Sequence, residues 1–363
     1  MEQFNKIMAY DSSALVFVGA NITTSRYGKA PQSIWNTEGI PTGGIFHFLR
    51  TFFTDLKTYT GKDCAIVPAF ESLTNYRKEI YPFYKGNRTT YRSIQGDEID
   101  TNILKNLSIK AWYNEFDQQT RKRFALKESS GLQIKIIKAL LEDVGVKTYS
   151  VDGCEADDIL YMVAIYMNYY NTNCKITIRC DDHDLADTKG FNHNVRLQGV
   201  TSKSTIASVP VGELLNKIMG GCTSDNIPSL PNGVEKSVLY DAISQGVVNP
   251  FDIKNGFTVD PTPLYQLGLS EDFVNQVLRN IYLVTPTLVE LPEIQSTVRE
   301  NLDWDKMYIW LSTLAQAKFC KETLHKEIDR TLPEVRDKVE EIQSLISPCL
   351  RDYIYKENQA YLR

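Results

Sequence analysis

The sequence lacks the features that mark several broad classes of protein. No apolar run reaches the roughly 18 residues of a membrane-spanning helix, and no basic segment at the N-terminus leads into an apolar one. Neither G-x-G-x-x-G nor G-x-x-x-x-G-K-[ST] follows an expected strand, which argues against an ordinary nucleotide-binding α/β protein. Internal repeats and low-complexity tracts are missing as well. We therefore expect a cytoplasmic globular protein with no membrane partner.

Cysteine is present but is not arranged for a metal cluster or a disulfide framework. The seven cysteines are odd in number, scattered, and never spaced as C-x-x-C: Cys64, Cys154, Cys174, Cys180, Cys222, Cys320 and Cys349. This pattern favours reduced thiols in a cytoplasmic compartment. Histidine is also scarce, and only His183 lies within an acidic cluster, where it is expected as a turn residue.

The chain has no excess of positive charge. Its formal net charge is −5 over 363 residues, with 42% hydrophobic and 23% charged residues, which is ordinary globular composition. Such a net charge argues against a polyanionic partner unless acidic and basic residues are segregated. They are: acids follow expected strands, whereas Arg, Lys and Tyr gather between residues 76 and 127. Taken alone, that polar stretch is expected to be a solvated insertion.

Strands alternate with helices through the first half of the chain. Apolar runs predict strands at 6–11, 63–70, 146–151 and 175–179, and periodic patterns predict helices after Gly44, at 129–145 and at 154–170. This order predicts an α/β fold with a mainly parallel central sheet and helices on both faces. Beyond Val211 the chain is expected to be mostly helical.

Carboxylates end or follow all four of these strands, where the site of a parallel sheet is expected, and one more lies in a Gly-rich turn at 220–228. Those at the strands are Asp11, Glu71, Glu155, Asp157, Asp158, Asp182 and Asp184, and the acid of the turn is Asp225. In isolation, the acids at 155–158 could simply favour a helix N-terminus, and those at 181–184 could form an acidic turn. Together they present hard oxygen ligands without convergent Cys or His, which suits Mg²⁺, with Mn²⁺ as a substitute. So many acids indicate two ions, which could activate water and stabilise a leaving oxygen of a phosphodiester.

Six ordered stretches resemble the flap endonuclease / 5′→3′ exonuclease family, including phage 5′-nucleases and the 5′-nuclease domain of bacterial DNA polymerase I. They are Asp11-Ser-Ser, Gly39-Ile-Pro-Thr, Tyr81-Pro-Phe-Tyr-Lys-Gly-Asn-Arg88, Gly153-Cys-Glu-Ala-Asp-Asp158, Asp182-His-Asp-Leu185 and Ser224-Asp-Asn-Ile-Pro228. Each is weak alone, but the ordered set, covering about residues 5–285, is specific.

The resemblance implies a role for each matching residue. The acids above would hold the ions, with Glu71 standing where the family has aspartate. Lys85 and Arg88 would reach the scissile phosphate, and Tyr84 would stack on a base near the 5′ end. Residues 76–128 would form a helical arch, within which Arg77 and Arg92 would contact nucleic acid. Lys236 would hold duplex backbone from a helix–hairpin–helix (H3TH) region.

These matches predict a monomeric structure-specific 5′-nuclease acting on DNA or RNA:DNA with a free 5′ end or flap. A nuclease core would span 1–210, the H3TH region 211–290, and a C-terminal helical segment of unassigned role 291–363. The likeness to phage enzymes implies a role in phage-type DNA replication or processing in the host cytoplasm. A single-strand-binding protein or a polymerase would be a further partner.

Two departures from the family pattern leave an alternative open. Cys222 stands where a further acid is usual, and Val234 replaces a hairpin glycine, where positive φ would be awkward. The alternative is a structure-specific DNA-binding protein of the same fold with a weakened active site.

Overall fold

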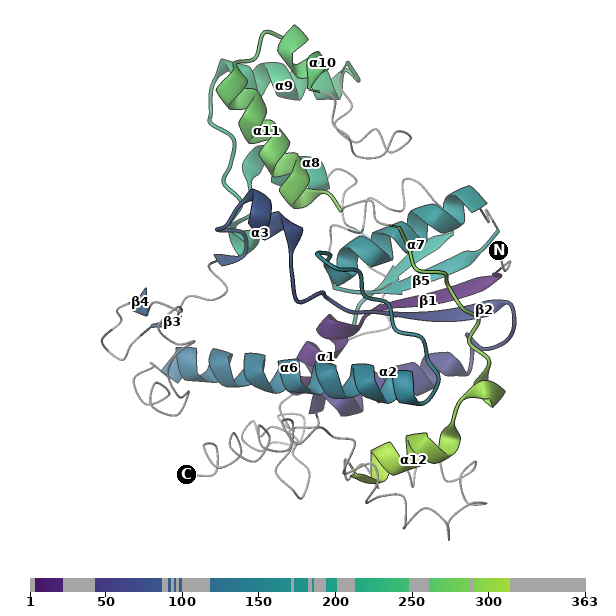
Figure 1. Ribbon diagram of the computed structural model, residues 1–363. Helices are drawn as coiled ribbons and strands as arrows, with labels where there is room; N and C mark the ends of the chain where they lie inside the picture. Colours follow the sequence, from purple (N-terminus) through teal and green to yellow (C-terminus); the bar gives the residue numbers. More distant parts are fainter. Residues whose placement is uncertain are drawn as a thin grey trace.

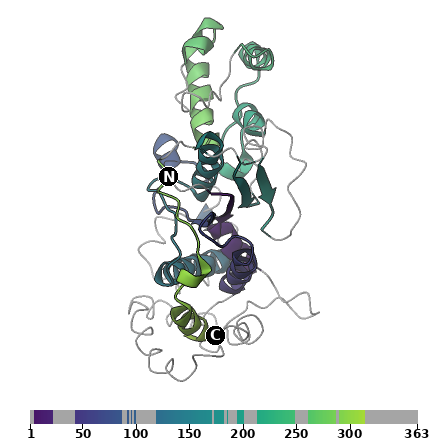
Figure 2. The same ribbon diagram turned by 90° about the vertical axis from the view of Figure 1, so that its right-hand side faces the viewer.

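The computed structural model describes residues 4–21, 43–86, 91–92, 95, 98–99, 118–170, 173–181, 185, 194–200, 213–247, 261–286 and 290–313. Three tiers are visible in Figure 1: a helical unit at the top, a sheet in the middle and further helices below. Figure 2 shows the same tiers from the side. The candidate site lies where the helical unit at the top meets the edge of the sheet.

The sheet has four parallel strands in the order β2-β1-β5-β6. Their bounds are β1 (Lys6–Asp11), β2 (Cys64–Ala69), β5 (Lys175–Arg179) and β6 (Val195–Gln198). The expected strands at 6–11, 63–70 and 175–179 are therefore confirmed, as is the mainly parallel α/β class. Strand β6 was not expected, because its sequence, Val-Arg-Leu-Gln, offers only a short alternation.

Helices cover both faces of the sheet, as period-two alternation in the strands requires. On one face Met8, Tyr10 and Ile66 pack against α1 (Ser12–Asn21), α2 (Gly43–Leu56) and α6 (Gln118–Asp143). On the other, Ile7 and Val67 pack against α7 (Ala156–Tyr170). The predicted apolar stripe of α2 is buried as expected, with Ile45, Phe48, Leu49, Phe52 and Leu56 all in the core.

Two expected elements differ in the structure. Helix α6 begins at Gln118 rather than near 129, since its first three turns are polar and carry little apolar periodicity. The expected strand at 146–151 is reduced to one parallel bridge between Tyr149 and Ala69. Further along the outer edge of β2, its hydrogen-bonding groups pair instead with Thr297, which donates to the Cys64 carbonyl (2.8 Å) and accepts from the Ile66 amide (2.9 Å).

The upper tier comprises α8 (Glu213–Gly220), a 3₁₀ turn (Thr223–Asp225), α9 (Val234–Ser244), α10 (Thr262–Gln266) and α11 (Glu271–Val284). Val234 begins α9 without positive φ, which falls instead at Asn226 and at glycines such as Gly221. The turn is therefore rebuilt around other residues. The short helix α3 (Tyr76–Ile80) lies between this tier and the sheet (Figure 1).

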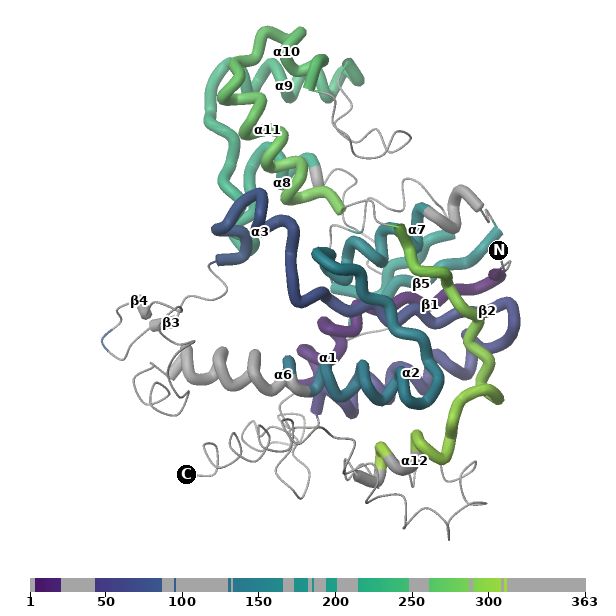
Figure 3. The backbone as a smooth tube through the Cα atoms, in the orientation of Figure 1, coloured from purple at the N-terminus to yellow at the C-terminus, as the bar shows by residue number. Residues whose placement is uncertain are grey.

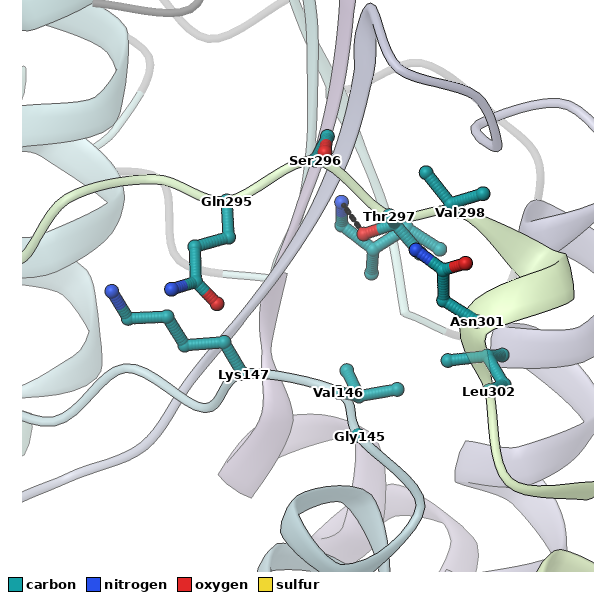
Figure 4. Close-up of a pocket in the computed structure, with 10 residues that line it drawn as sticks. Gly145, Val146, Lys147, Gln295, Ser296, Thr297, Val298, Asn301 and Leu302 are labelled. Atoms are coloured by element: carbon teal, nitrogen blue, oxygen red, sulfur yellow. Dashed lines mark hydrogen bonds between the residues drawn. The ribbon is translucent and has the colours of Figure 1, made fainter.

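A segment at 290–298 descends from the upper tier past β2 to α12 (Trp304–Thr313), as the tube in Figure 3 shows. Between this segment and Gly145-Val146-Lys147 lies a polar cavity of about 190 Å³ (Figure 4). It borders the outer edge of β2. Its lining contains none of the expected site residues, so this cavity is not the candidate active site. Met307 and Leu311 of α12 join the lower core, and the expected helices beyond 313 lie outside the described residues.

Two short strands, β3 (Tyr91–Arg92) and β4 (Glu98–Ile99), pair antiparallel within the expected arch. In the described part of the chain, no helix combines the length and apolarity needed to cross a bilayer.

Candidate active site

The N-terminus of α7 places three acids at the carboxyl edge of the sheet. Glu155 precedes the helix, and the Asp158 carboxylate accepts a hydrogen bond from the Glu155 amide (2.9 Å). This is half of a capping box, which satisfies one of the amides that a helix start leaves open. Because residues three apart share a helix face, Glu155 and Asp158 are both brought toward α3.

Asp158 forms a fully buried ion pair with Arg77 of α3. The carboxylate is 0% exposed, and its oxygens accept hydrogen bonds from Arg77 Nη1 (2.9 Å) and Nη2 (2.7 Å). Arg77 also donates to the carbonyls of Leu283 and Thr285 at the end of α11. Burial would lower the pKa of Arg77, but Asp158 outweighs it and raises that pKa well above its usual value. The guanidinium therefore stays charged and joins α3, α7 and the end of α11.

This placement changes how two expected site residues must be understood. Arg77 is 4% exposed, so its guanidinium lies away from any surface that a nucleic acid reaches. Asp158 gives both oxygens to Arg77, so a metal ion at this carboxylate would have to compete with the guanidinium. The sequence pattern has no signal for this, because an arginine among tyrosines and lysines looks the same whether exposed or buried.

Glu155 is the centre of a second set of contacts. One carboxylate oxygen accepts from Lys85 Nζ (2.6 Å) and Asn75 Nδ2 (2.8 Å), and the other accepts from the Tyr84 hydroxyl (3.2 Å). Arg77 lies 3.4 Å away. Burial would raise the pKa of Glu155, but Lys85 and then Arg77 overcome this, so the pKa is lowered. Glu155 is thus held as a carboxylate.

Lys85 reaches Glu155 from a backbone conformation that is uncommon for a side chain other than glycine. Its φ is +53°, and its amide donates to the Asp225 carbonyl (2.7 Å) in the upper tier. Positive φ costs about 1–2 kcal/mol for most residues and persists where the surroundings enforce it. The upper tier therefore fixes the lysine that the resemblance assigns to the scissile phosphate.

A small cavity of about 30 Å³ collects the remaining central groups. Glu155, Asp157 and Asp225 line it together with the cations Lys85 and Lys217. Carboxylates and ammonium groups therefore converge on one small space.

Cys222, which precedes the 3₁₀ turn, contacts one of the acids that line this cavity. Its thiol is buried and donates toward Asp225 Oδ2 (3.3 Å), while Ser224 Oγ lies 3.1 Å from the sulfur. The structure thus places the residue that replaces a family acid directly beside Asp225.

Asp11 is the last residue of β1, and Glu71 follows the end of the neighbouring strand β2. Asp11 is half-buried, and its carboxylate accepts from the Ala14 amide (2.8 Å) at the start of α1. Glu71 is exposed and lies two residues beyond Ala69, the register partner of Asp11. Both therefore lie at the same sheet edge as α7, although neither lines the small cavity.

Several expected site residues lie outside the described residues: Arg88, Asp182 and Asp184. Arg92 is described only as backbone, paired with Glu98 in the β3–β4 ribbon. Lys236 lies in the first turn of α9, where its amine contacts the Leu230 carbonyl (3.4 Å) and Asn232 Oδ1 (3.3 Å). It remains on the surface expected to face duplex backbone.

The donor set suits a hard divalent ion, although the described residues alone do not complete a site. No group of three or more His, Cys, Asp or Glu side chains in that part of the chain is close enough to hold a metal. Glu155 and Asp158 are engaged by Lys85 and Arg77, and Asp157 and Asp225 line the cavity beside Glu155. Asp182 and Asp184 would be the nearest additions in sequence terms, since they follow β5.

Sequence reasoning missed two residues at the site. Asn75 donates to Glu155 and also caps α3 by accepting from the Arg77 amide (2.9 Å). Lys217 lies in α8, three residues before the Gly-rich turn, and faces the same cavity. An asparagine before a short helix is a recognisable N-cap signal. Lys217 has no comparable signal, because one lysine on a polar helix face is ordinary.

A family model described as the N-terminal resolvase-like domain of 5′-3′ exonucleases matches residues 14–209. Two curated relatives, both called 5′-3′ exonuclease, come from Buchnera aphidicola. The protein of subspecies Schizaphis graminum (strain Sg) is 24% identical over 221 residues, covering 58% of this chain and 62% of the relative. That of subspecies Acyrthosiphon pisum (strain APS) is 23% identical over 213 residues, covering 56% and 61%. The chain thus spans less than two thirds of either relative.

Two solved structures of T5 nucleases are also similar to this chain. A flap endonuclease in a pseudo-enzyme-product complex with DNA and metal ions has 16% identity and a TM-score of 0.45, covering 77% of this chain and 88% of that one. A T5 5′-exonuclease with divalent zinc bound has 19% identity and a TM-score of 0.44, covering 77% and 89%. Neither likeness assigns a role to a residue of this chain.

Proposed function

The chain belongs to the family of 5′-3′ exonucleases with an N-terminal resolvase-like domain, and from this premise we propose that it is a divalent-metal-dependent 5′-nuclease. It would hydrolyse phosphodiesters of DNA or RNA:DNA near a free 5′ end or at a flap. The observation that carries this proposal is the cavity in which Asp157, Asp225 and Glu155 meet Lys85 and Lys217.

Acids and cations have separate tasks in this proposal. Asp11, Asp157, Asp225 and Glu155 would hold Mg²⁺ or Mn²⁺ directly or through water, with Glu71, Asp182 and Asp184 completing the set. When bound, two such ions supply an activated water and stabilise the leaving oxygen of a phosphodiester. Our proposal of two ions rests on the number of carboxylates at one sheet edge.

Lys85 supplies the positive charge that a phosphodiester transition state requires. Its amine lies 2.6 Å from Glu155 and lines the cavity, so a phosphate entering there would meet an ammonium already in place. Lys217 adds a second cation from α8. Because the Lys85 backbone is bonded to Asp225, the cation and one acid are positioned by the same contact (2.7 Å).

We propose the upper tier as the duplex-binding unit, with Lys236 on nucleic-acid backbone. The sequence likeness to phage enzymes supports a role in DNA replication or processing in the host cytoplasm. A single-strand-binding protein or a polymerase would be its partner there.

Cleavage of a 5′-labelled flap duplex tests the proposal. Mg²⁺ or Mn²⁺ should give products mapping to the junction or the 5′ end, and EDTA should abolish them. Asp157→Asn and Lys85→Ala should each reduce kcat at least about a hundred-fold without loss of folding. Lys78→Ala, an exposed lysine on α3, is the matched control and should retain kcat. If both site variants cleave at the normal rate, the assignment is wrong.

One observation favours a second candidate, a structure-specific DNA-binding protein with a weakened site. Cys222 occupies the place of an acid and contacts Asp225, so it contributes no second carboxylate there. Tight binding of the flap duplex without cleavage in either metal would support this candidate over the nuclease.

A further inference from the structure

Two aromatic residues that are adjacent in the chain, Phe83 and Tyr84, lie in opposite environments at the site. Tyr84, to which the resemblance assigns a stacking role, is 3% exposed, and its hydroxyl is bonded to Glu155. The Lys85 amine lies 5.2 Å from the centre of its ring. The Tyr84 ring is thus already packed in the core of the upper tier. By contrast, Phe83 is 65% exposed.

The exposed ring of Phe83 is supported from behind. Its centroid lies 5.6 Å from that of Tyr81, with the planes inclined by 62°, an edge-to-face arrangement. The guanidinium of Arg279 lies 5.5 Å from the centre of the Tyr81 ring. Such contacts are worth about 0.5–1.5 kcal/mol beyond buried area and hold rings in defined orientations. Phe83, Tyr81 and Arg279 form what we call the aromatic stack.

The backbone beneath the stack is fixed by the upper tier. The Phe83 carbonyl accepts hydrogen bonds from Asn226 Nδ2 and the Gly86 amide, each at 2.9 Å. Asn226 immediately follows Asp225. Phe83 is only two residues from Lys85, so their Cα atoms lie within about 7 Å. Phe83 therefore lies in the same short segment as Lys85, whose side chain lines the cavity. This segment directly follows α3 in Figures 1 and 3.

We propose that the aromatic stack, through the exposed face of Phe83, is the surface on which a base of the substrate strand stacks beside the scissile phosphate. The role that the resemblance gives to Tyr84 passes to its neighbour. This inference rests on the proposed nuclease function and specifies how that site holds its strand.

Charge and chemistry favour a nucleobase over an apolar protein partner. Phe83 shares its short segment with Lys85 and packs against Tyr81, whose ring faces Arg279, so a strand that stacks a base here brings a phosphate toward these two cations. Among the described ion pairs, Arg279 has no carboxylate partner, and its bonds go to the neutral Asn280 amide. Aromatic stacking combined with backbone cations is how single strands are gripped without sequence preference.

Binding measurements with a 5′-flap duplex in EDTA, where cleavage is blocked, test the inference. Loss of one stacked base should weaken binding about ten-fold or more in Phe83→Ala. Phe83→Leu should show the same loss, because it keeps apolar bulk without the flat ring, whereas Phe83→Trp should bind like the wild type. Ile80→Ala, an apolar residue of α3 that is 42% exposed, is the matched control and should leave affinity unchanged.

A photo-crosslink gives an independent readout. With 5-iodouracil placed in turn at the nucleotides next to the cleavage position, the crosslinked peptide should carry Phe83. Crosslinking to Tyr84 instead, or Phe83→Ala affinity within about two-fold of wild type, would overturn the inference. Wild-type cleavage separates the two proposals: if it occurs while Phe83→Ala binds normally, only the stacking inference fails. If the wild type neither binds nor cleaves, both fail.

Discussion

Replacing Asp158 by asparagine should distinguish a buried structural charge from a metal ligand. The resemblance assigns this carboxylate to the metal site, whereas the structure gives both of its oxygens to Arg77 at 2.7 and 2.9 Å. The two roles predict opposite changes in stability when no metal is present. A ligand surrounded by other acids should be relieved by losing its charge, but a partner of a buried cation should not.

The size of the effect follows from burial. Arg77 is 4% exposed and Asp158 is 0% exposed, so the guanidinium would remain desolvated with an amide in place of its counter-ion. Breaking a buried pair in this way costs about 3–5 kcal/mol. The new amide still has an oxygen that can accept from the Glu155 amide, so the α7 cap need not be lost. We therefore expect Asp158→Asn to lower the free energy of unfolding by about 3–5 kcal/mol.

Urea unfolding in EDTA, followed by tryptophan fluorescence and circular dichroism, measures this difference. Asp157→Asn, one residue away and outside the pair, is the control and should change stability by less than about 1 kcal/mol. In a double-mutant cycle, Arg77→Met should recover part of the loss caused by Asp158→Asn, because it removes the unpaired charge. An Asp158→Asn variant as stable as the wild type, or more stable, would refute the structural role.

Three further results are expected. Gly221→Ala should cost about 2–4 kcal/mol in a thermal melt, because φ is +74° and a Cβ would lie 2.5 Å from backbone atoms, whereas Gly220→Ala, with nothing within 4 Å, should be tolerated. Asp55→Ala should cost about 3–5 kcal/mol in urea, since it leaves Arg179, now 2.9 Å from the carboxylate, buried without a partner. Burial lowers the pKa of His47, so below about pH 6.5 the unfolded chain takes up the proton first and wild-type stability should fall. His47→Gln should flatten that fall, and equal slopes would contradict it.

The sequence was sufficient to predict three of the four strands, β1, β2 and β5, because each is a short apolar run bounded by polar residues. Buried strands such as Cys64–Ala69 need no partner information to be recognised. The carboxyl-edge rule then brought Asp11 and the α7 acids together, and the structure agrees on that edge. The pattern could not predict which segment pairs with the outer edge of β2. Thr297, more than 200 positions away in the chain, donates its amide to the Cys64 carbonyl and accepts a hydrogen bond from the Ile66 amide.

Burial of individual side chains was the other limit of the sequence pattern. The stretch containing Arg77, Tyr84 and Lys85 is polar throughout, and composition alone predicted a solvated insertion. In the structure only part of it is exposed, because the end of α11 supplies carbonyl acceptors for Arg77. Such acceptors are backbone groups and leave no trace in side-chain identity. The sequence of α11 therefore gives no sign that its carbonyls, together with Asp158, allow Arg77 to be buried.

The ion pairs also change what the acid count means for catalysis. Eight carboxylates were expected to hold metal, yet Arg77 and Lys85 already balance Asp158 and Glu155 at 2.7 and 2.6 Å. The protein's own cations thus neutralise part of the site before any ion enters. A divalent ion that binds Glu155 must compete with Lys85 for the same oxygen, and the released ammonium would then be available to a phosphate. If Glu155 is a metal ligand, as proposed, metal affinity and the position of Lys85 would therefore be coupled through one carboxylate.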